Sequence, residues 1–109
     1  MKFSHLEVAM ELLEVFKALS NETRLQMLQW LKHPEIHFPK PLNGDIREDG
    51  VCVSDIHKKV GLSQSTVSLY LSMLQNAGLI KAKRIGQFTY YKRDEENIKK
   101  MTELLAREL

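Results

Sequence analysis

The chain has 109 residues, of which 43% are hydrophobic, and this is enough for one domain with a modest core. No apolar run approaches the ~20 residues that span a bilayer, and polar residues interrupt the N-terminal stretch where a signal peptide would be apolar. A single cysteine, Cys52, excludes an intrachain disulfide and a cysteine-rich zinc site. We therefore expect a cytoplasmic protein with no membrane partner.

The net charge of +2 is distributed unevenly along the chain. Residues 51–93 hold seven lysines and arginines but one acidic residue. Residues 1–50 hold six basic and eight acidic residues, and residues 94–109 hold three basic and five acidic residues. A basic block between mildly acidic flanks is the usual electrostatic mark of a surface that binds a polyanion. Scattered, solvated lysines would give the same count, so charge alone leaves both interpretations open.

The first predicted helix covers residues 5–19, where apolar residues recur at helical spacing in two stripes. One stripe consists of Leu6, Met10, Leu13 and Phe16, and the other of Val8, Leu12, Val15 and Leu19. An apolar arc this wide is more than one contact surface needs. We expect the helix to cover its own core and also to meet a second copy of the chain.

A second helix is predicted to follow, with Ser20 or Asn21 as its N-cap, and to end at His33-Pro34. Its inward face is expected to consist of Leu25, Leu28 and Leu31, with Met27 and Trp30 beside it. Residues 34–50 hold all three prolines and two glycines and show no periodicity. They are predicted to be a long inserted loop, whose role stays open.

Two short helices are predicted around a tight turn in residues 53–77. Val53, Ile56 and Val60 give the first its apolar face, with Ser54 or Asp55 as the cap and Gly61 at the end. Ser63 caps the second, Gly78 closes it, and its buried face is Val67, Leu71 and Leu74.

The remaining residues predict a hairpin and a last helix. Residues 79–93 alternate and are rich in β-branched and aromatic side chains, which indicates a two-stranded hairpin with its tip near Gly86. A C-terminal helix beginning near Asp94 carries Ile98, Met101, Leu104 and Leu105 at helical spacing. The whole chain, 1–109, is therefore predicted to be one mainly α winged helix-turn-helix domain, with the helix-turn-helix at 53–77 and the wing at 79–93.

The helix that begins after Ser63 presents short polar side chains away from its buried face. In a major groove, Gln64 can form a paired hydrogen bond to adenine, Ser65 and Ser68 can reach base edges or phosphates, and Leu69 fits a thymine methyl. A competing interpretation is that these hydroxyls only cap the helix. The neighbouring glycines and the basic hairpin favour DNA. The predicted contact residues are Lys58, Lys59, Gln64, Ser65, Thr66, Ser68, Leu69, Ser72, Lys83, Arg84 and Gln87.

Two segments together resemble a known family: "VFKALSNETRLQMLQWL" (15–31) and "VSDIHKKVGLSQSTVSLYLSMLQNAGLIKAKRIGQFTYYKR" (53–93). They are similar to the ArsR/SmtB family of bacterial winged-helix repressors. The resemblance implies a homodimer joined by the first and last helices, and repression through a short inverted-repeat operator on double-stranded DNA. It also implies that Gln64, Ser65 and Ser68 face bases and that the hairpin around Gly86 is the wing.

The chain departs from this family at its two usual metal sites. Where one site has Cys-Val-Cys-Asp, this chain has Cys52, Val53, Ser54 and Asp55, and its last helix contains no histidine. We therefore expect no metal and no cofactor. A small-molecule or metal effector is not expected either, but it stays open. A metal site built from Cys52 with His33, His37 or His57, or a redox response of Cys52, stays open as an alternative.

Two other function classes can be weighed from the sequence. A winged helix can serve as a protein-interaction module, with the 34–50 loop as a docking element, but such a module has no need of the basic block. An enzyme is not indicated, because the chain has no Ser/His/Asp arrangement, no glycine-rich phosphate loop and no paired carboxylates in a plausible cleft.

Overall fold

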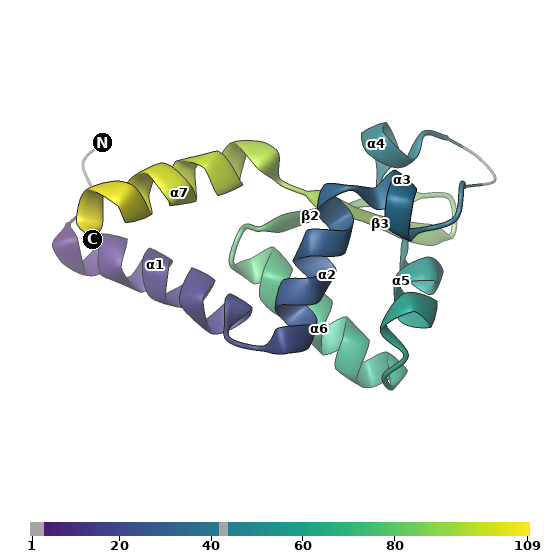
Figure 1. The fold of residues 1–109 in the computed structure, drawn as a ribbon, viewed down its shortest axis with the longest axis horizontal. Helices are drawn as coiled ribbons and strands as arrows, with labels where there is room; N and C mark the ends of the chain where they lie inside the picture. Colours follow the sequence, from purple (N-terminus) through teal and green to yellow (C-terminus); the bar gives the residue numbers. More distant parts are fainter. Residues whose placement is uncertain (1–3, 42–43) are drawn as a thin grey trace.

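The computed structural model describes residues 4–41 and 44–109, so Leu42 and Asn43 of the expected loop lie outside the described residues. The elements in chain order are α1 (His5–Leu19), α2 (Glu22–Lys32), α3 (Pro34–His37), α4 (Ile46–Asp49), β1 (Val51–Cys52), α5 (Val53–Val60), α6 (Gln64–Asn76), β2 (Ile80–Ile85), β3 (Phe88–Arg93) and α7 (Glu95–Glu108). Helices α1 and α7 extend together to one side of a body that contains the other elements (Figure 1). In the described residues, no helix is both long and apolar enough to cross a membrane.

The core lies between α1, α2, α5, α6 and the sheet. Its most buried side chains include Met27 of α2, Ile56 of α5 and the three predicted residues of α6, Val67, Leu71 and Leu74, each at most 2% exposed. The prediction for Leu25 was wrong, because this side chain is 41% exposed. The inward arc of α2 is formed by residues 24, 27, 28 and 31, and Leu25 lies on its flank.

The two apolar stripes of α1 have different surroundings in the monomer. Leu12 and Val15 are buried in the core, together with Ala18. The other stripe is exposed: Leu6 by 70%, Met10 by 60%, Leu13 by 50% and Phe16 by 42%. The prediction that this helix has more apolar surface than its own core covers is confirmed.

The sheet has three antiparallel strands in the order β1-β3-β2. The predicted hairpin of β2 and β3 is confirmed, with Ile85 opposite Phe88 at its tip. Val51 and Cys52 pair with Tyr91 and Tyr90 as a third strand, which the sequence did not predict. Two residues are too few for an alternation of apolar and polar side chains to show in the sequence.

The segment 34–50 is more ordered than the predicted loop. Pro34 occupies the first turn of α3, where its missing N–H costs nothing. Asp45 caps α4 by accepting a hydrogen bond from the backbone N–H of Arg47 (2.8 Å). Helix α4 contacts α3 and β3, so the described part of this segment packs on the sheet.

Candidate nucleic-acid interface

Helices α5 and α6 are joined by the tight turn Gly61-Leu62-Ser63. Gly61 has φ +74°, a left-handed conformation that glycine adopts without steric cost, and its N–H donates to the carbonyl of His57 (3.1 Å). Ser63 caps α6 as predicted, because its hydroxyl accepts from the backbone N–H of Thr66 (3.2 Å). The predicted caps Ser54 and Asp55 of α5 were wrong: the N-cap is Cys52, with no side-chain capping hydrogen bond.

The outer face of α6 carries the side chains predicted to meet bases. Gln64, Ser65, Ser68, Leu69 and Ser72 are all exposed, whereas Thr66 is half-buried and its hydroxyl accepts from Ser63 (2.7 Å). Leu69 is 58% exposed although it is apolar. This face therefore combines one amide, several hydroxyls and one apolar group that no core residue covers. That these groups contact DNA stays a prediction.

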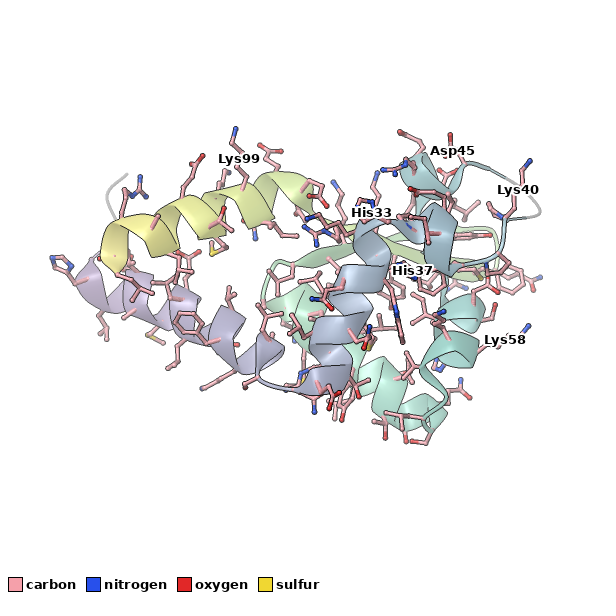
Figure 2. All side chains as sticks on the ribbon, viewed as in Figure 1. His33, His37, Lys40, Asp45, Lys58 and Lys99 are labelled. Carbon is pink, nitrogen blue, oxygen red and sulfur yellow. The ribbon has the colours of Figure 1, made fainter. Side chains whose placement is uncertain are left out.

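The two lysines at the end of α5 are exposed but have different surroundings. Lys58 projects away from the body (Figure 2). The ammonium of Lys59 lies 5.2 Å from the centroid of the Trp30 ring, within the range of a cation–π interaction. Lys59 is therefore partly engaged by α2, whereas Lys58 has no such contact and is the more available for a phosphate.

The wing contributes three predicted contact residues. Lys83 of β2 donates a hydrogen bond to Asp49 of α4 (2.8 Å) and forms an ion pair with it. This bond holds the pKa of Asp49 below its ordinary value of 3.8, and it raises the pKa of Lys83 above 10.5. Arg84 donates from Nε to the carbonyl of Gly86 (3.2 Å), and Gln87 is exposed.

The pairing of Lys83 with Asp49 was not predicted from the sequence. The two residues are 34 positions apart, and Asp49 lies in a segment with no recognisable pattern. A phosphate that approaches Lys83 must compete with the carboxylate. The sequence predicted that Lys83 meets a phosphate or an adjacent minor groove, and in the structure it is paired with Asp49.

Cys52 lies half-buried, with its sulfur 3.3 Å from the hydroxyl of Ser54. Within residues 4–41 and 44–109, no group of three or more His, Cys, Asp or Glu side chains is placed to hold a metal ion. The structure therefore does not bring Cys52 together with His33, His37 or His57 in such a group.

An exposed polar helix after a tight turn, with a basic hairpin beside it, defines a DNA-binding protein of the winged helix-turn-helix class. The sequence profile of the arsR family of bacterial regulatory proteins matches residues 46–82. The HTH-type transcriptional regulator YbzH of Bacillus subtilis is 58% identical over 100 residues, which cover 92% of this chain and all of the relative. The chain belongs to the ArsR family, and it is a transcriptional regulator with a DNA-binding winged helix, not an enzyme.

Two further similarities extend over most of the chain. A cadmium resistance regulatory protein of Staphylococcus aureus, a CadC homolog, is 32% identical over 94 residues, which cover 86% of this chain and 66% of the relative. A homodimeric winged helix-turn-helix DNA-binding domain from Mycobacterium bovis, solved in solution, superposes with a TM-score of 0.65 at 27% identity, covering 95% of this chain and 84% of that one.

Proposed function

We propose that this regulator is a cytoplasmic, sequence-specific repressor that binds an inverted-repeat operator as a homodimer. The observation that carries the proposal is the outer face of α6, where Gln64, Ser68 and Leu69 are exposed beside a basic wing. Hydroxyl and amide groups can donate and accept hydrogen bonds at base edges, and an apolar side chain suits a thymine methyl. Bound across a promoter, such a dimer would exclude polymerase.

Dimerisation is supported by the apolar surface that α1 and α7 leave open. Phe16 of the exposed stripe of α1 lines a groove together with Ile98, Met101 and Leu105 of α7, which are only half-buried. A groove of about 180 Å³ with almost wholly apolar walls lies between α1, α2 and α7. Contiguous exposed apolar surface marks an interaction site. The similar domain from Mycobacterium bovis is homodimeric.

A two-fold symmetric pair would present two recognition helices to one face of the duplex. Half-sites of helix-turn-helix dimers lie about 34 Å apart, one turn of DNA, and their operators mirror the symmetry of the protein. Lys58 and Arg84 of each subunit would contact phosphates, which supplies affinity that falls with salt. Gln64, Ser65, Ser68 and Leu69 would select the sequence.

Repression is proposed to work without the two usual metal sites of the family. Ser54 stands where the second thiol would be needed, and α7 contains no histidine. The CadC homolog is named for cadmium resistance, but the donor atoms that suit a soft metal are scarce here, since Cys52 is the one thiol of the chain. Titration of the purified protein with Zn²⁺ tests this point, and a saturable loss of operator affinity would contradict it.

The proposed roles of Gln64 in base recognition and of Arg84 in phosphate contact are tested by comparing Gln64→Ala with Arg84→Ala. Bound duplexes are first selected from a random pool, and the affinities for selected and random duplexes are then measured by fluorescence anisotropy at several salt concentrations. Gln64→Ala should cost about 1–3 kcal/mol on the selected duplex and leave the salt slope unchanged. Arg84→Ala should weaken both duplexes alike and lower the slope by about 1.

Gln75→Ala is the matched control, because Gln75 is an exposed glutamine at the opposite end of α6. It should bind both duplexes as the wild type does. Equal losses on selected and random DNA for Gln64→Ala would contradict the role assigned to that residue.

A further inference from the structure

A cleft of about 250 Å³ lies between the end of α2, the segment 34–50, the base of the hairpin and the start of α7. Its walls carry five cationic side chains, Lys32, Arg47, Lys81, Lys92 and Arg93, and two acids, Glu95 and Glu96. The cations therefore outnumber the acids by three. A concave surface lined mainly by one sign of charge concentrates ions of the opposite sign.

Two of these lysines face each other across the sheet. Lys81 of β2 and Lys92 of β3 are direct cross-strand partners, so their side chains leave the same face of the hairpin. Like charges in this position destabilise a sheet. A bound anion would remove that repulsion, because each ammonium group could then donate to it.

The protein neutralises only part of this charge. Arg93 pairs with Glu95 (2.6 Å), and Arg47 pairs with Glu35 outside the cleft. Lys92 donates to the backbone carbonyl of Glu48 (2.6 Å). Its charge also helps to lower the pKa of Asp49, whose carboxylate is paired with Lys83, but within the described residues Lys92 forms no ion pair of its own. In the described part of the chain, Lys32 and Lys81 have no hydrogen bond or ion pair.

One wall of the cleft is apolar. Its apolar lining residues are Leu31, Pro34 and Ile46. A site with a cationic wall and an apolar wall fits an amphiphilic small molecule better than a bare inorganic ion. The volume limits the occupant to a small metabolite.

The cleft is separate from the DNA-binding face. It lies at the base of the hairpin, where Ile80 pairs with Arg93, whereas the wing tip is at the other end. Helix α6 begins at the lower edge of Figure 1, while α4, which borders the cleft, lies at the upper edge with α3 below it. A duplex held by the outer face of α6 would leave the cleft open to solvent.

We propose that this cleft binds a small organic anion. Its carboxylate or phosphate group accepts hydrogen bonds from Lys32, Lys81 and Lys92, and its short apolar portion packs on Leu31 and Ile46. This inference goes beyond the proposed function, and binding at the cleft does not depend on DNA. Because the occupant would contact α2, α4 and the base of the wing together, it would also tie the 34–50 segment to the sheet.

The proposal is tested with the full chain and three probes of equal chain length: hexyl phosphate, hexanoate and uncharged hexanamide. Binding is measured by isothermal titration calorimetry and by the shift in thermal midpoint, at constant ionic strength and without DNA. At least one of the two anions should bind saturably, and the tighter one identifies the head group. Hexanamide should bind at least about tenfold more weakly, since it carries no negative charge and its hydrogen bonds to the lysines are not strengthened by an opposite charge.

Two variants locate the site, and two more are matched controls. Lys81→Gln and Lys32→Gln remove cleft cations that hold no partner in the described structure, so both should fold, and each should weaken the anion about tenfold. Lys40→Gln and Lys99→Gln remove exposed lysines outside the cleft (Figure 2) and should bind as the wild type does.

Three results would overturn the proposal: no saturable binding of either anion, equal binding of hexanamide, or equal losses in the cleft variants and the controls. None of them bears on operator binding, which is measured without the probes. A failure of the proposed repressor function would in turn leave the calorimetry unaffected.

Discussion

The side-chain amide of Asn97 donates a hydrogen bond to the backbone carbonyl of Gly78 (2.7 Å). Gly78 follows the recognition helix α6 and has φ +78°, while Asn97 lies in the first turn of α7. Asp94 orients this turn, because its carboxylate accepts from the backbone N–H of Asn97 (3.1 Å). The end of the recognition helix is thus attached to the start of a helix proposed to form the dimer.

Asn97→Ala removes this attachment and leaves the half-buried carbonyl of Gly78 without its donor. We expect the free energy of unfolding to fall by about 1 kcal/mol, the usual net value of such a bond. Urea unfolding followed by circular dichroism measures it. Asn76→Ala, which changes an exposed asparagine at the end of α6, is the control, and an equal loss in both variants would contradict the assigned role.

Arg24 is the one charged side chain of the described core, at 8% exposure. Its Nε donates to the carbonyl of Ala18 (2.8 Å) and its Nη2 to that of Lys17 (3.1 Å), so it satisfies carbonyls at the end of α1 from the neighbouring helix. Its guanidinium also lies 5.0 Å from the centroid of the Tyr70 ring. One side chain therefore joins α1, α2 and α6.

Arg24→Lys keeps the charge but loses the planar fork that reaches two carbonyls at once. We expect the free energy of unfolding to fall by about 1–3 kcal/mol, as for hydrogen bonds to charged groups. Arg47→Lys, at an exposed arginine paired with Glu35, should leave stability unchanged. Equal stability of Arg24→Lys and the wild type would show that the fork is dispensable.

Local chemistry explains which features could be predicted from the sequence. The caps Asn21, Ser63 and Asp94 each act on a backbone N–H within three residues, and all three were among the residues expected to begin helices. The buried face of α6 and the tip of the hairpin followed from periodicity in the same way. The exposure of Gln64 and Ser68 agrees with their expected place on the outer face, but base contact is a further step that exposure alone does not test.

The features that were missed depend on contacts between distant segments. Strand β1 exists because Val51 and Cys52 meet β3 about 40 residues later in the chain, as the pairing of Val51 with Tyr91 shows. The two hydrogen bonds that hold α4 on the sheet also join distant segments. Lys83 donates to the carboxylate of Asp49, and Lys92 donates to the backbone carbonyl of Glu48. No local pattern in residues 34–50 predicts these contacts. The charge count over 51–93 was right, but it could not show that an acid from outside that block lies against the wing.

The exposed stripe of α1 gives a test of the proposed dimer. Leu13→Glu puts a carboxylate into each half of a symmetric interface, so its cost is counted twice. We expect the dissociation constant of the dimer to rise at least about a hundredfold, because a buried, unpaired carboxylate is strongly disfavoured. Sedimentation equilibrium measures this. Ile36→Glu, on an exposed residue of α3, should leave self-association unchanged, and an unaltered dimer in Leu13→Glu would refute the placement of the interface.

The ion pair of Asp49 and Lys83 predicts how its contribution to stability depends on pH. The pKa of Asp49 is lowered in the folded protein by the hydrogen bond from Lys83, so its contribution is present above the ordinary value of 3.8 and is lost as pH falls through the lower, folded pKa. The pKa of Lys83 is raised by Asp49, so its contribution is present below 10.5 and is lost as pH rises through the higher, folded pKa.

The difference in unfolding free energy between the wild type and Asp49→Asn should therefore be constant near neutral pH and shrink at both extremes. Urea titrations at a series of pH values measure it. A difference that stays the same from strong acid to strong alkali would show that the ion pair does not contribute.

Asp49→Asn also tests whether Lys83 is restrained from binding DNA. Without the carboxylate, the ammonium of Lys83 no longer has an ion-pair partner in the described structure and is available to a phosphate. If Lys83 then contacts the backbone, affinity for selected and random duplexes should rise together, and the salt slope should steepen by about 0.9 for the one added phosphate contact. Glu103→Gln makes the same change of charge on an exposed residue of α7, and it should alter neither quantity. If both variants steepen the slope equally, the effect is one of net charge. If Asp49→Asn leaves the slope unchanged, Lys83 does not reach the duplex and should be removed from the proposed interface.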